Sequence, residues 1–302
     1  MSVTPSRQPE PPIDRCAASV NAVGGGDTAS VETMTPNDPS DNDQTSPKAN
    51  IFNRPGVSDV FLQTAGCAHI GDDACAKTFG FKAAGICIPF RHLDGTPIVD
   101  GDRPFARVRL YDATETQKYS QRGRSGVHIF IPPGFKDSLK KSTVFLVEGE
   151  FKAAALMEAG FAALGICGIT GACQSVDGEA TLNSELVKIL QSHQPARLVF
   201  LGDSDVVLNA QFAAEAAKLF KLVRKDRRLQ FVESYLIAKP PVDGEKGVDD
   251  CRQAYGEKFA KWFSELSQVA YSVPAKATAL DIHIDLLKRC FQYLLRIARS
   301  GL

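Results

Sequence analysis

The sequence predicts an α/β fold: a mostly parallel sheet flanked by helices, preceded by a small, mainly β subdomain and an N-terminal tail. Three observations support this prediction. Between residues 143 and 266, short apolar runs alternate with helical segments, which is typical of parallel sheets. Between 57 and 142, strand-like runs are separated by turn-forming residues. Residues 1–52 are rich in Pro, Ser, Thr, Asn, Asp and Gly.

The tail comes first along the chain. Its segment has almost no aromatic residues, so it buries too little surface to offset the entropy of ordering, and we expect residues 1–52 to be disordered. In the subdomain that follows, we expect a short helix near 59–63 and strands within 85–90 and 105–112. The segment HLDGTPIVDGDRP between these strands is rich in turn formers.

The α/β region, 143–266, contains the longest periodic segments. We expect strands at 144–147, 162–166, 197–203 and 230–237. We expect helices at 151–160, 182–193, 209–223 and 251–266, with a glycine-bearing loop at 168–173. The C-terminal segment, 267–302, contains an amphipathic helix at 281–299 that either docks on the core or leads into something larger.

Composition sets the limits on function. The chain has 302 residues with 44% hydrophobic content, enough for one large domain or two of ordinary size. Lys plus Arg and Asp plus Glu number 35 each, so a role with nucleic acid requires a local patch and does not follow from net charge. No run of about eighteen apolar residues and no signal pattern occurs, so we expect a cytoplasmic protein without membrane contact.

The eight cysteines are scattered without a CxxC pair, which favours reduced thiols in a cytosol. The nearest approach to a metal cluster is Cys67, His69 and Cys75 together with Cys87. Because the tight two-residue spacing of zinc sites is missing, ordinary packing is the favoured interpretation.

Acidic residues follow the predicted strands where these end. The acids are Glu148, then Asp203 and Asp205, then Asp249 and Asp250. The carboxyl ends of parallel strands meet at one edge of a sheet, so these side chains should gather there and repel one another unless a cation neutralises them. Mg²⁺, or Mn²⁺, takes oxygen ligands of this kind. Alternatively, Glu148 and Glu150 only favour the start of a helix, and the D-x-D pair lies on the surface.

Basic residues gather in the β subdomain. Arg107 and Arg109 alternate on one strand face, and the loop after it adds Lys118 beside Tyr119. Arg122 and Arg124 complete the group. Basic residues interleaved with an aromatic ring suit a phosphate backbone with a stacked base, although a solvated strand face has the same pattern.

Three motifs in this order, VEGEFKAAAL, LVFLGDSD and KGVDDC, resemble the TOPRIM domain of DnaG-type primases, topoisomerases and some nucleases. The stretches ICIPFRHLDGTPI and QKYSQRGRSGVHIFIPPGF are similar to the part of DnaG-type primases that precedes TOPRIM, including its Lys-Tyr pair. The nearest resemblance is to a TOPRIM-like domain of unknown function in replication proteins of plasmids, phages and integrated elements, often ahead of a helicase-type ATPase. It covers about residues 57–265.

The resemblance implies roles for single residues. Glu148 matches the glutamate proposed as acid/base or metal ligand, and Asp203 with Asp205 matches the metal-binding D-x-D. Asp249 or Asp250 corresponds loosely to further acids of primases. The chain departs from the pattern in two places. Lys152 replaces a primase aspartate, and Val206 and Val207 replace the usual Ala-Gly. Lys152 therefore either pairs with a carboxylate or touches phosphate, and Glu150 would compensate for the lost ligand.

These expectations lead to one function and two alternatives. The resemblance implies a primase-like, metal-dependent nucleotidyltransferase that makes primers on single-stranded DNA from nucleoside triphosphates, with Glu148, Asp203 and Asp205 as catalytic residues. The first alternative is a non-catalytic nucleic-acid-binding or nucleotide-binding module serving a helicase, which Lys152 and the lack of a recognisable zinc-binding domain favour. The second is a metal-dependent nuclease. A topoisomerase is disfavoured, since no companion domain with a nucleophilic tyrosine is evident.

Overall fold

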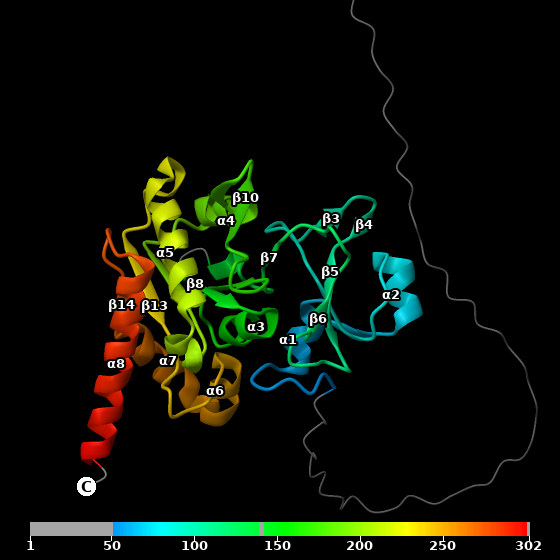
Figure 1. Ribbon diagram of the computed structural model, residues 1–302. Coiled ribbons are helices and arrows are strands. Elements are labelled where there is room, and N and C mark those ends of the chain that lie inside the picture. Colours follow the sequence, from blue (N-terminus) through cyan, green and yellow to red (C-terminus); the bar gives the residue numbers. More distant parts are fainter. Residues whose placement is uncertain (1–50, 139–141, 301–302) are drawn as a thin grey trace, which may run out of the picture. The chain divides into compact units, whose positions relative to one another are not determined.

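The computed structural model describes residues 51–138 and 142–300, which lie within one compact unit, Ala49–Leu302 (Figure 1). The predicted tail lies outside the described residues except for Ile51 and Phe52. The mixed α/β fold class predicted from the sequence is confirmed.

A six-stranded sheet forms the centre of the larger part. Its order is β14 (Tyr271–Ser272), β13 (Ser234–Ala238), β12 (Arg197–Leu201), β8 (Thr143–Glu148), β9 (Ala163–Ile166) and β7 (Ile129–Phe130). The four inner strands are parallel to one another, whereas β14 and β7 pair antiparallel at the two edges. All four predicted strands of this region are present, and their carboxyl ends lie at one edge.

Helices cover both faces of this sheet because the central residues of its inner strands are apolar on both faces. Val144 and Leu146 of β8 face one hydrophobic cluster, and Phe145 and Val147 face the other, as the two-residue period of a strand requires. The first cluster contains residues of α4 (Ser184–His193), α5 (Ala210–Lys225) and α8 (Ala279–Ser300). The second contains residues of α3 (Glu150–Glu158), α6 (Val248–Tyr255) and α7 (Phe259–Gln268).

The smaller part is an antiparallel sheet with two helices. Its strand order is β1 (Ala68–Ile70), β2 (Gly85–Pro89), β5 (Ala106–Leu110) and β6 (Tyr119–Ser120), with a ribbon of β3 (Val99–Asp100) and β4 (Arg103–Pro104) beside it. Its helices are α1 (Asp59–Thr64) and α2 (Asp72–Phe79). Its core is continuous with the larger part, since the ring of Phe90 contacts that of Phe130 in β7 at 5.4 Å between centroids.

Two of the differences between the structure and the prediction concern a hairpin and a helix. The predicted loop at 168–173 is followed by a hairpin of β10 (Cys173–Val176) and β11 (Glu179–Leu182), which was not predicted and whose turn residues Asp177 and Gly178 have positive φ. An Asp-Gly pair between two short runs is a strong hairpin signal. The helix expected at 251–266 is two helices, because Gly256 ends α6 at a φ of 52° before α7 begins.

The C-terminal helix α8 docks on the core through Ile282 and Leu286, which are buried, while residues 291–300 are exposed. Of the helices in 51–138 and 142–300, none combines the length and apolar character needed to cross a membrane.

Candidate functional site

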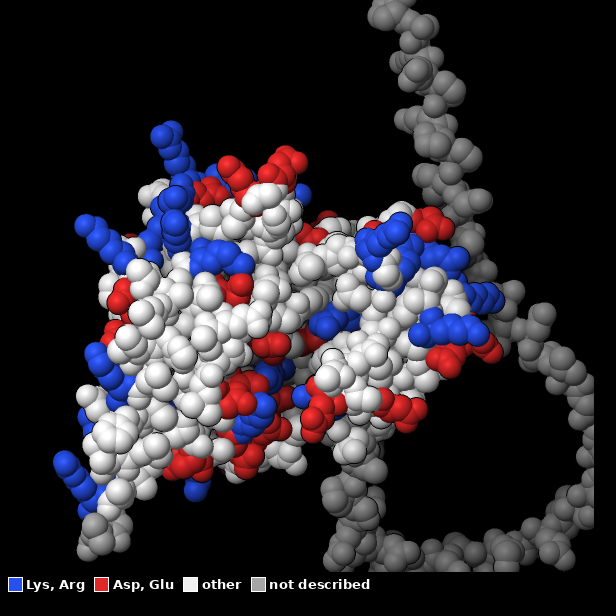
Figure 2. Space-filling view, viewed as in Figure 1, with Lys and Arg blue, Asp and Glu red and all other residues white. Residues whose placement is uncertain are grey.

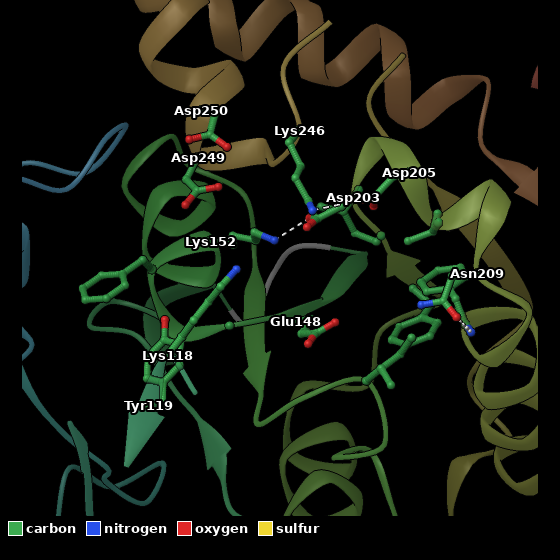
Figure 3. Close-up of a pocket in the computed structure, with 18 of the residues that line it drawn as sticks. Lys118, Tyr119, Glu148, Lys152, Asp203, Asp205, Asn209, Lys246, Asp249 and Asp250 are labelled. Atoms are coloured by element: carbon green, nitrogen blue, oxygen red, sulfur yellow. Dashed lines mark hydrogen bonds and ion pairs between the residues drawn. The ribbon is translucent and has the colours of Figure 1, made fainter. Parts of the chain in front are cut away.

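A cavity of about 450 Å³ opens at the carboxyl edge of the central sheet (Figure 3). One wall is the sheet edge with the starts of α3 and α6, and the other comes from β5 and β6 of the smaller part. The charged side chains that line it are Arg54, Arg109, Lys118, Lys152, Lys246, Glu148, Asp203, Asp205, Asp249 and Asp250. The acids predicted to gather at this edge therefore do line one cavity.

Glu148 is held at the edge by the turn that follows it. Gly149 has a φ of 104°, a conformation that favours glycine, so the chain leaves β8 and enters α3 within one residue. The Gly149 amide donates to the Ile166 carbonyl at 3.1 Å, and the Gly149 carbonyl accepts from Ala153 at 3.3 Å. Glu148 thus ends a strand and does not cap the helix.

The D-x-D segment is fixed by backbone hydrogen bonds to the neighbouring strand and loop. The Gly202 amide donates to the Ala238 carbonyl at 3.0 Å, and the Ser204 amide donates to the Lys246 carbonyl at 2.9 Å. Asp203 and Asp205 then lead into a short 3₁₀ turn, η2 (Ser204–Leu208). These contacts place both aspartates beside the loop that carries Lys246.

Each aspartate of the D-x-D pair forms an ion pair with a lysine. Lys152, near the start of α3, binds Asp203, and Lys246 binds Asp205 at 2.9 Å (Figure 3). Among the charged residues lining the cavity, five are basic and five acidic. Acidic and basic side chains also intermix around the central hollow in the face shown in Figure 2.

The remaining acids of the cavity differ in their surroundings. Desolvation raises the pKa of Glu148, and the nearby Asp203 raises it further while Lys152 opposes the shift. Burial likewise raises the pKa of Asp249, whose Oδ1 atom is buried without a hydrogen-bond partner among the described residues. Asp250 is used locally, because its Oδ2 accepts from the Gly247 amide at 3.1 Å and caps α6.

Three of the predicted basic-region residues line the opposite wall: Arg109, Lys118 and Tyr119. The Arg109 guanidinium carbon lies 5.0 Å from the centroid of the Tyr119 ring, a cation–π contact, and Lys118 reaches into the cavity (Figure 3). Tyr119 is half-buried, and its pKa is raised mainly by desolvation. The ring of Tyr119 packs against the guanidinium groups of Arg107 and Arg109.

The other basic residues are used elsewhere. Arg107 forms an ion pair with Glu150, whose side chain is only 1% exposed, and Arg107 does not line the cavity. Glu150 does not line the cavity, and its carboxylate is paired with Arg107. Arg122 binds Asp100 at 2.9 Å, and neither Arg122 nor Arg124 lines the cavity.

The predicted magnesium or manganese site does not fit this arrangement. Within residues 51–138 and 142–300, no group of three or more His, Cys, Asp or Glu side chains is placed as metal ligands would be. The set Glu148, Asp203, Asp205, Asp249 and Asp250 is thus not brought together as ligands. Lys152 and Lys246 already pair with Asp203 and Asp205, so these two aspartates do not require a divalent cation for their charge balance.

Among the described residues, the cysteine–histidine group is likewise not placed as metal ligands would be. His69 contacts the Tyr111 hydroxyl and the Ile51 carbonyl, whereas Cys67 and Cys87 are buried thiols. Burial raises the pKa of each of these two thiols to about 12, so they behave as packing residues.

Two cavity residues were missed from the sequence. Lys246 immediately precedes the glycine of the KGVDD motif, and that position was the available signal. Arg54 lines the cavity with its guanidinium 4.7 Å from the Phe151 ring centroid, and no motif marks it.

Residues 137–259 match a family model described as a domain of unknown function (DUF3854). No curated protein matches the chain significantly. The solved structures to which the chain is similar include three primase structures.

The primase of Aquifex aeolicus (zinc-binding and RNA polymerase domains) has 14% identity and a TM-score of 0.47, over 72% of this chain and 54% of that one. The RNA polymerase domain of Mycobacterium tuberculosis primase DnaG has 15% identity and a TM-score of 0.46, over 70% and 72% of the two chains. The structure of the same domain in complex with double-stranded DNA has 14% identity and a TM-score of 0.47, over 78% of this chain and 80% of that one. Thus this chain spans about half of the Aquifex chain.

Proposed function

We propose that the cavity binds the phosphates of single-stranded DNA or of a nucleoside triphosphate, as part of a primase-like replication protein. One observation carries this proposal: Arg109 and Lys118 face a sheet edge whose D-x-D carboxylates are paired with lysines. A phosphate entering between the walls meets Arg109 and Lys118, which form no ion pair with the described residues, on one side, and the lysine-paired Asp203 and Asp205 on the other.

The geometry of the basic wall supports this function. Arg109 is oriented by its contact with Tyr119, which reduces the freedom that the guanidinium loses on binding a phosphate oxygen. Lys118, which immediately precedes Tyr119 in the sequence, extends into the same cavity (Figure 3). Electrostatic contacts of this type bind a nucleic-acid backbone without reading its sequence.

The second candidate is catalysis by the same cavity, namely primer synthesis by nucleotidyl transfer. It is favoured by Glu148, Asp203 and Asp205 lining one cavity at the ends of two adjacent parallel strands. Mg²⁺ or Mn²⁺ would be the expected cofactor, although the lysine pairs described above do not fit it. Cleavage of DNA by a metal-dependent nuclease would use the same acids.

One experiment separates these functions. The protein is incubated with a labelled single-stranded oligonucleotide and nucleoside triphosphates, with Mg²⁺, Mn²⁺ or EDTA, and both binding and products are measured. We expect the labelled strand to be retained by the protein. New oligomers would establish the transferase, shorter fragments would establish the nuclease, and failure to retain the strand in every buffer would refute the proposed binding function.

A further inference from the structure

We infer that Lys152 and Lys246 are built-in counter-ions of Asp203 and Asp205, so that phosphate binding in the cavity requires no divalent cation. This inference rests on the proposed function, and it specifies how the site recognises its ligand. It also gives a role to Lys152, one of the two places at which the sequence departs from the primase pattern.

The structure makes room for Lys152 at its position. A Cβ atom on Gly247 would lie 3.0 Å from the Cε atom of Lys152 and 2.5 Å from the Oδ1 atom of Asp249. Glycine at this position therefore leaves space for the lysine stem beside the start of α6, and a larger residue would require the side chains of Lys152 and Asp249 to shift. The ammonium group ends on Asp203, and the side chain is 18% exposed. Lys152 is thus a packed part of the cavity wall.

Lys246 is held on the D-x-D segment by its own backbone. Its carbonyl accepts a hydrogen bond at 2.9 Å from the amide of Ser204, the residue between the two aspartates. Its ammonium group binds Asp205 at 2.9 Å. The two contacts tie the loop after β13 to the turn after β12. This lysine and Asp205 are both more than half exposed, so the pair adds little to stability and mainly sets the local charge.

The electrostatic consequence concerns an incoming phosphate. Asp203 and Asp205 alone would repel it, whereas each aspartate with its lysine is neutral overall. Arg109 and Lys118 on the opposite wall then attract the phosphate without competition from these two acids. A metal ion at Asp203 and Asp205 would have to displace both ammonium groups before it supplied the same charge.

The test replaces the lysine charges and keeps their stems. Lys152→Met, Lys246→Met and the double variant are compared with wild type and with Lys221→Met, an exposed lysine of α5 outside the cavity. Binding of a labelled single-stranded oligonucleotide is titrated in EDTA and in Mg²⁺ at matched ionic strength. Melting curves confirm that each variant is folded.

We expect wild type and Lys221→Met to bind equally well in both buffers. The double variant should lose about tenfold in affinity in EDTA and regain most of it in Mg²⁺, since the ion replaces the missing charge. Adding Asp203→Asn to Lys152→Met should restore binding in EDTA, because the unpaired acid is removed.

Two outcomes would overturn the inference while leaving the binding function intact: wild type that binds only with Mg²⁺, or folded lysine variants that bind like wild type in EDTA. Absence of binding by wild type in both buffers would overturn the proposed function together with the inference.

Discussion

Gly247 is the residue on which the position of Lys152 depends most directly. In Gly247→Ala the new Cβ would lie 2.5 Å from Asp249 Oδ1 and 3.0 Å from Lys152 Cε. We expect the substitution to lower the free energy of unfolding by about 1–3 kcal/mol, the usual cost of overpacking. Urea unfolding measures the change. Gly123→Ala is the matched control, because nothing lies within 4 Å of its Cβ, and it should change stability by less than about 0.5 kcal/mol. Equal stability of the two variants would contradict the assigned packing.

The ion pair between Arg107 and Glu150 is the second residue-scale feature with a measurable consequence. Glu150 is almost fully buried, and Arg107 is 14% exposed, so removing one partner leaves a buried charge. We expect Glu150→Gln to destabilise the protein by about 3–5 kcal/mol. The double variant Glu150→Gln/Arg107→Met should recover much of this loss, since no buried charge remains. A double-mutant cycle by urea unfolding gives the coupling, and purely additive effects would disprove a paired, buried contact.

The sequence predicts these residues only in part. The alternation of Arg107 and Arg109 places both on one face of β5, and both guanidinium groups do lie over the Tyr119 ring. Which of the two arginines faces the cavity depends on Glu150, which pairs with Arg107 and lies 43 positions after it in the chain. The pairing of Lys152 with a carboxylate was one of two roles left open for it, and the structure selects Asp203.

At the scale of elements, Glu158 joins three helices. Its carboxylate accepts from the amide and hydroxyl of Ser58, the N-cap of α1, and from Arg252 of α6 at 2.6 Å. Burial alone would raise the pKa of Glu158, but these donors outweigh it and lower the pKa. A carboxyl group whose pKa is lowered by folding stabilises the protein at pH values above its pKa in the unfolded chain, about 4.3. This stabilisation is lost as the pH falls through the pKa of the folded state.

We therefore expect Glu158→Gln to be less stable than wild type at pH 7 and to approach wild type in acid, where Glu158 becomes protonated. Chemical unfolding at several pH values measures both. Glu257→Gln, at an exposed position beyond α6, should have the same free energy of unfolding as wild type at every pH. A stability difference for Glu158→Gln that stays constant down to acid pH would show that the carboxylate charge does not hold the helices together.

The predicted elements are mostly those with a strong local signal, although the Asp-Gly signal of the β10–β11 hairpin was missed. The inner strands β8, β9, β12 and β13 are apolar runs bounded by turns, and each was predicted from its own residues. The edge strands β7 and β14 have two residues each, too few for a period to be recognised. Their pairing is decided by neighbours distant in sequence, since Ile129 of β7 pairs with Ile166 of β9.

At the scale of the whole molecule, the hydrophobic core crosses the boundary that the sequence predicts near residue 142. One cluster contains Phe90 and Phe105 from the smaller part together with Phe145 and Phe151 from the larger. The cavity likewise takes its walls from both parts, so its charge balance depends on segments that no local motif connects. The fold class follows from local alternation, whereas the pairing of acids with lysines requires the assembled chain.

The salt dependence of single-strand binding tests the central claim most directly, that Arg109 and Lys118 of the cavity contact phosphate. Affinity for a labelled oligonucleotide is measured over a range of salt concentrations for wild type and Arg109→Gln/Lys118→Gln. The control is Lys221→Gln/Lys225→Gln, which removes two exposed charges of α5 outside the cavity. Each lost phosphate contact lowers the logarithmic slope by about 0.7 for single strands, so we expect the cavity variant to lose about 1.4. The control should keep the wild-type slope. A folded cavity variant with an unchanged slope, or an equal loss in the control, would contradict the assignment of this cavity as the phosphate-binding site.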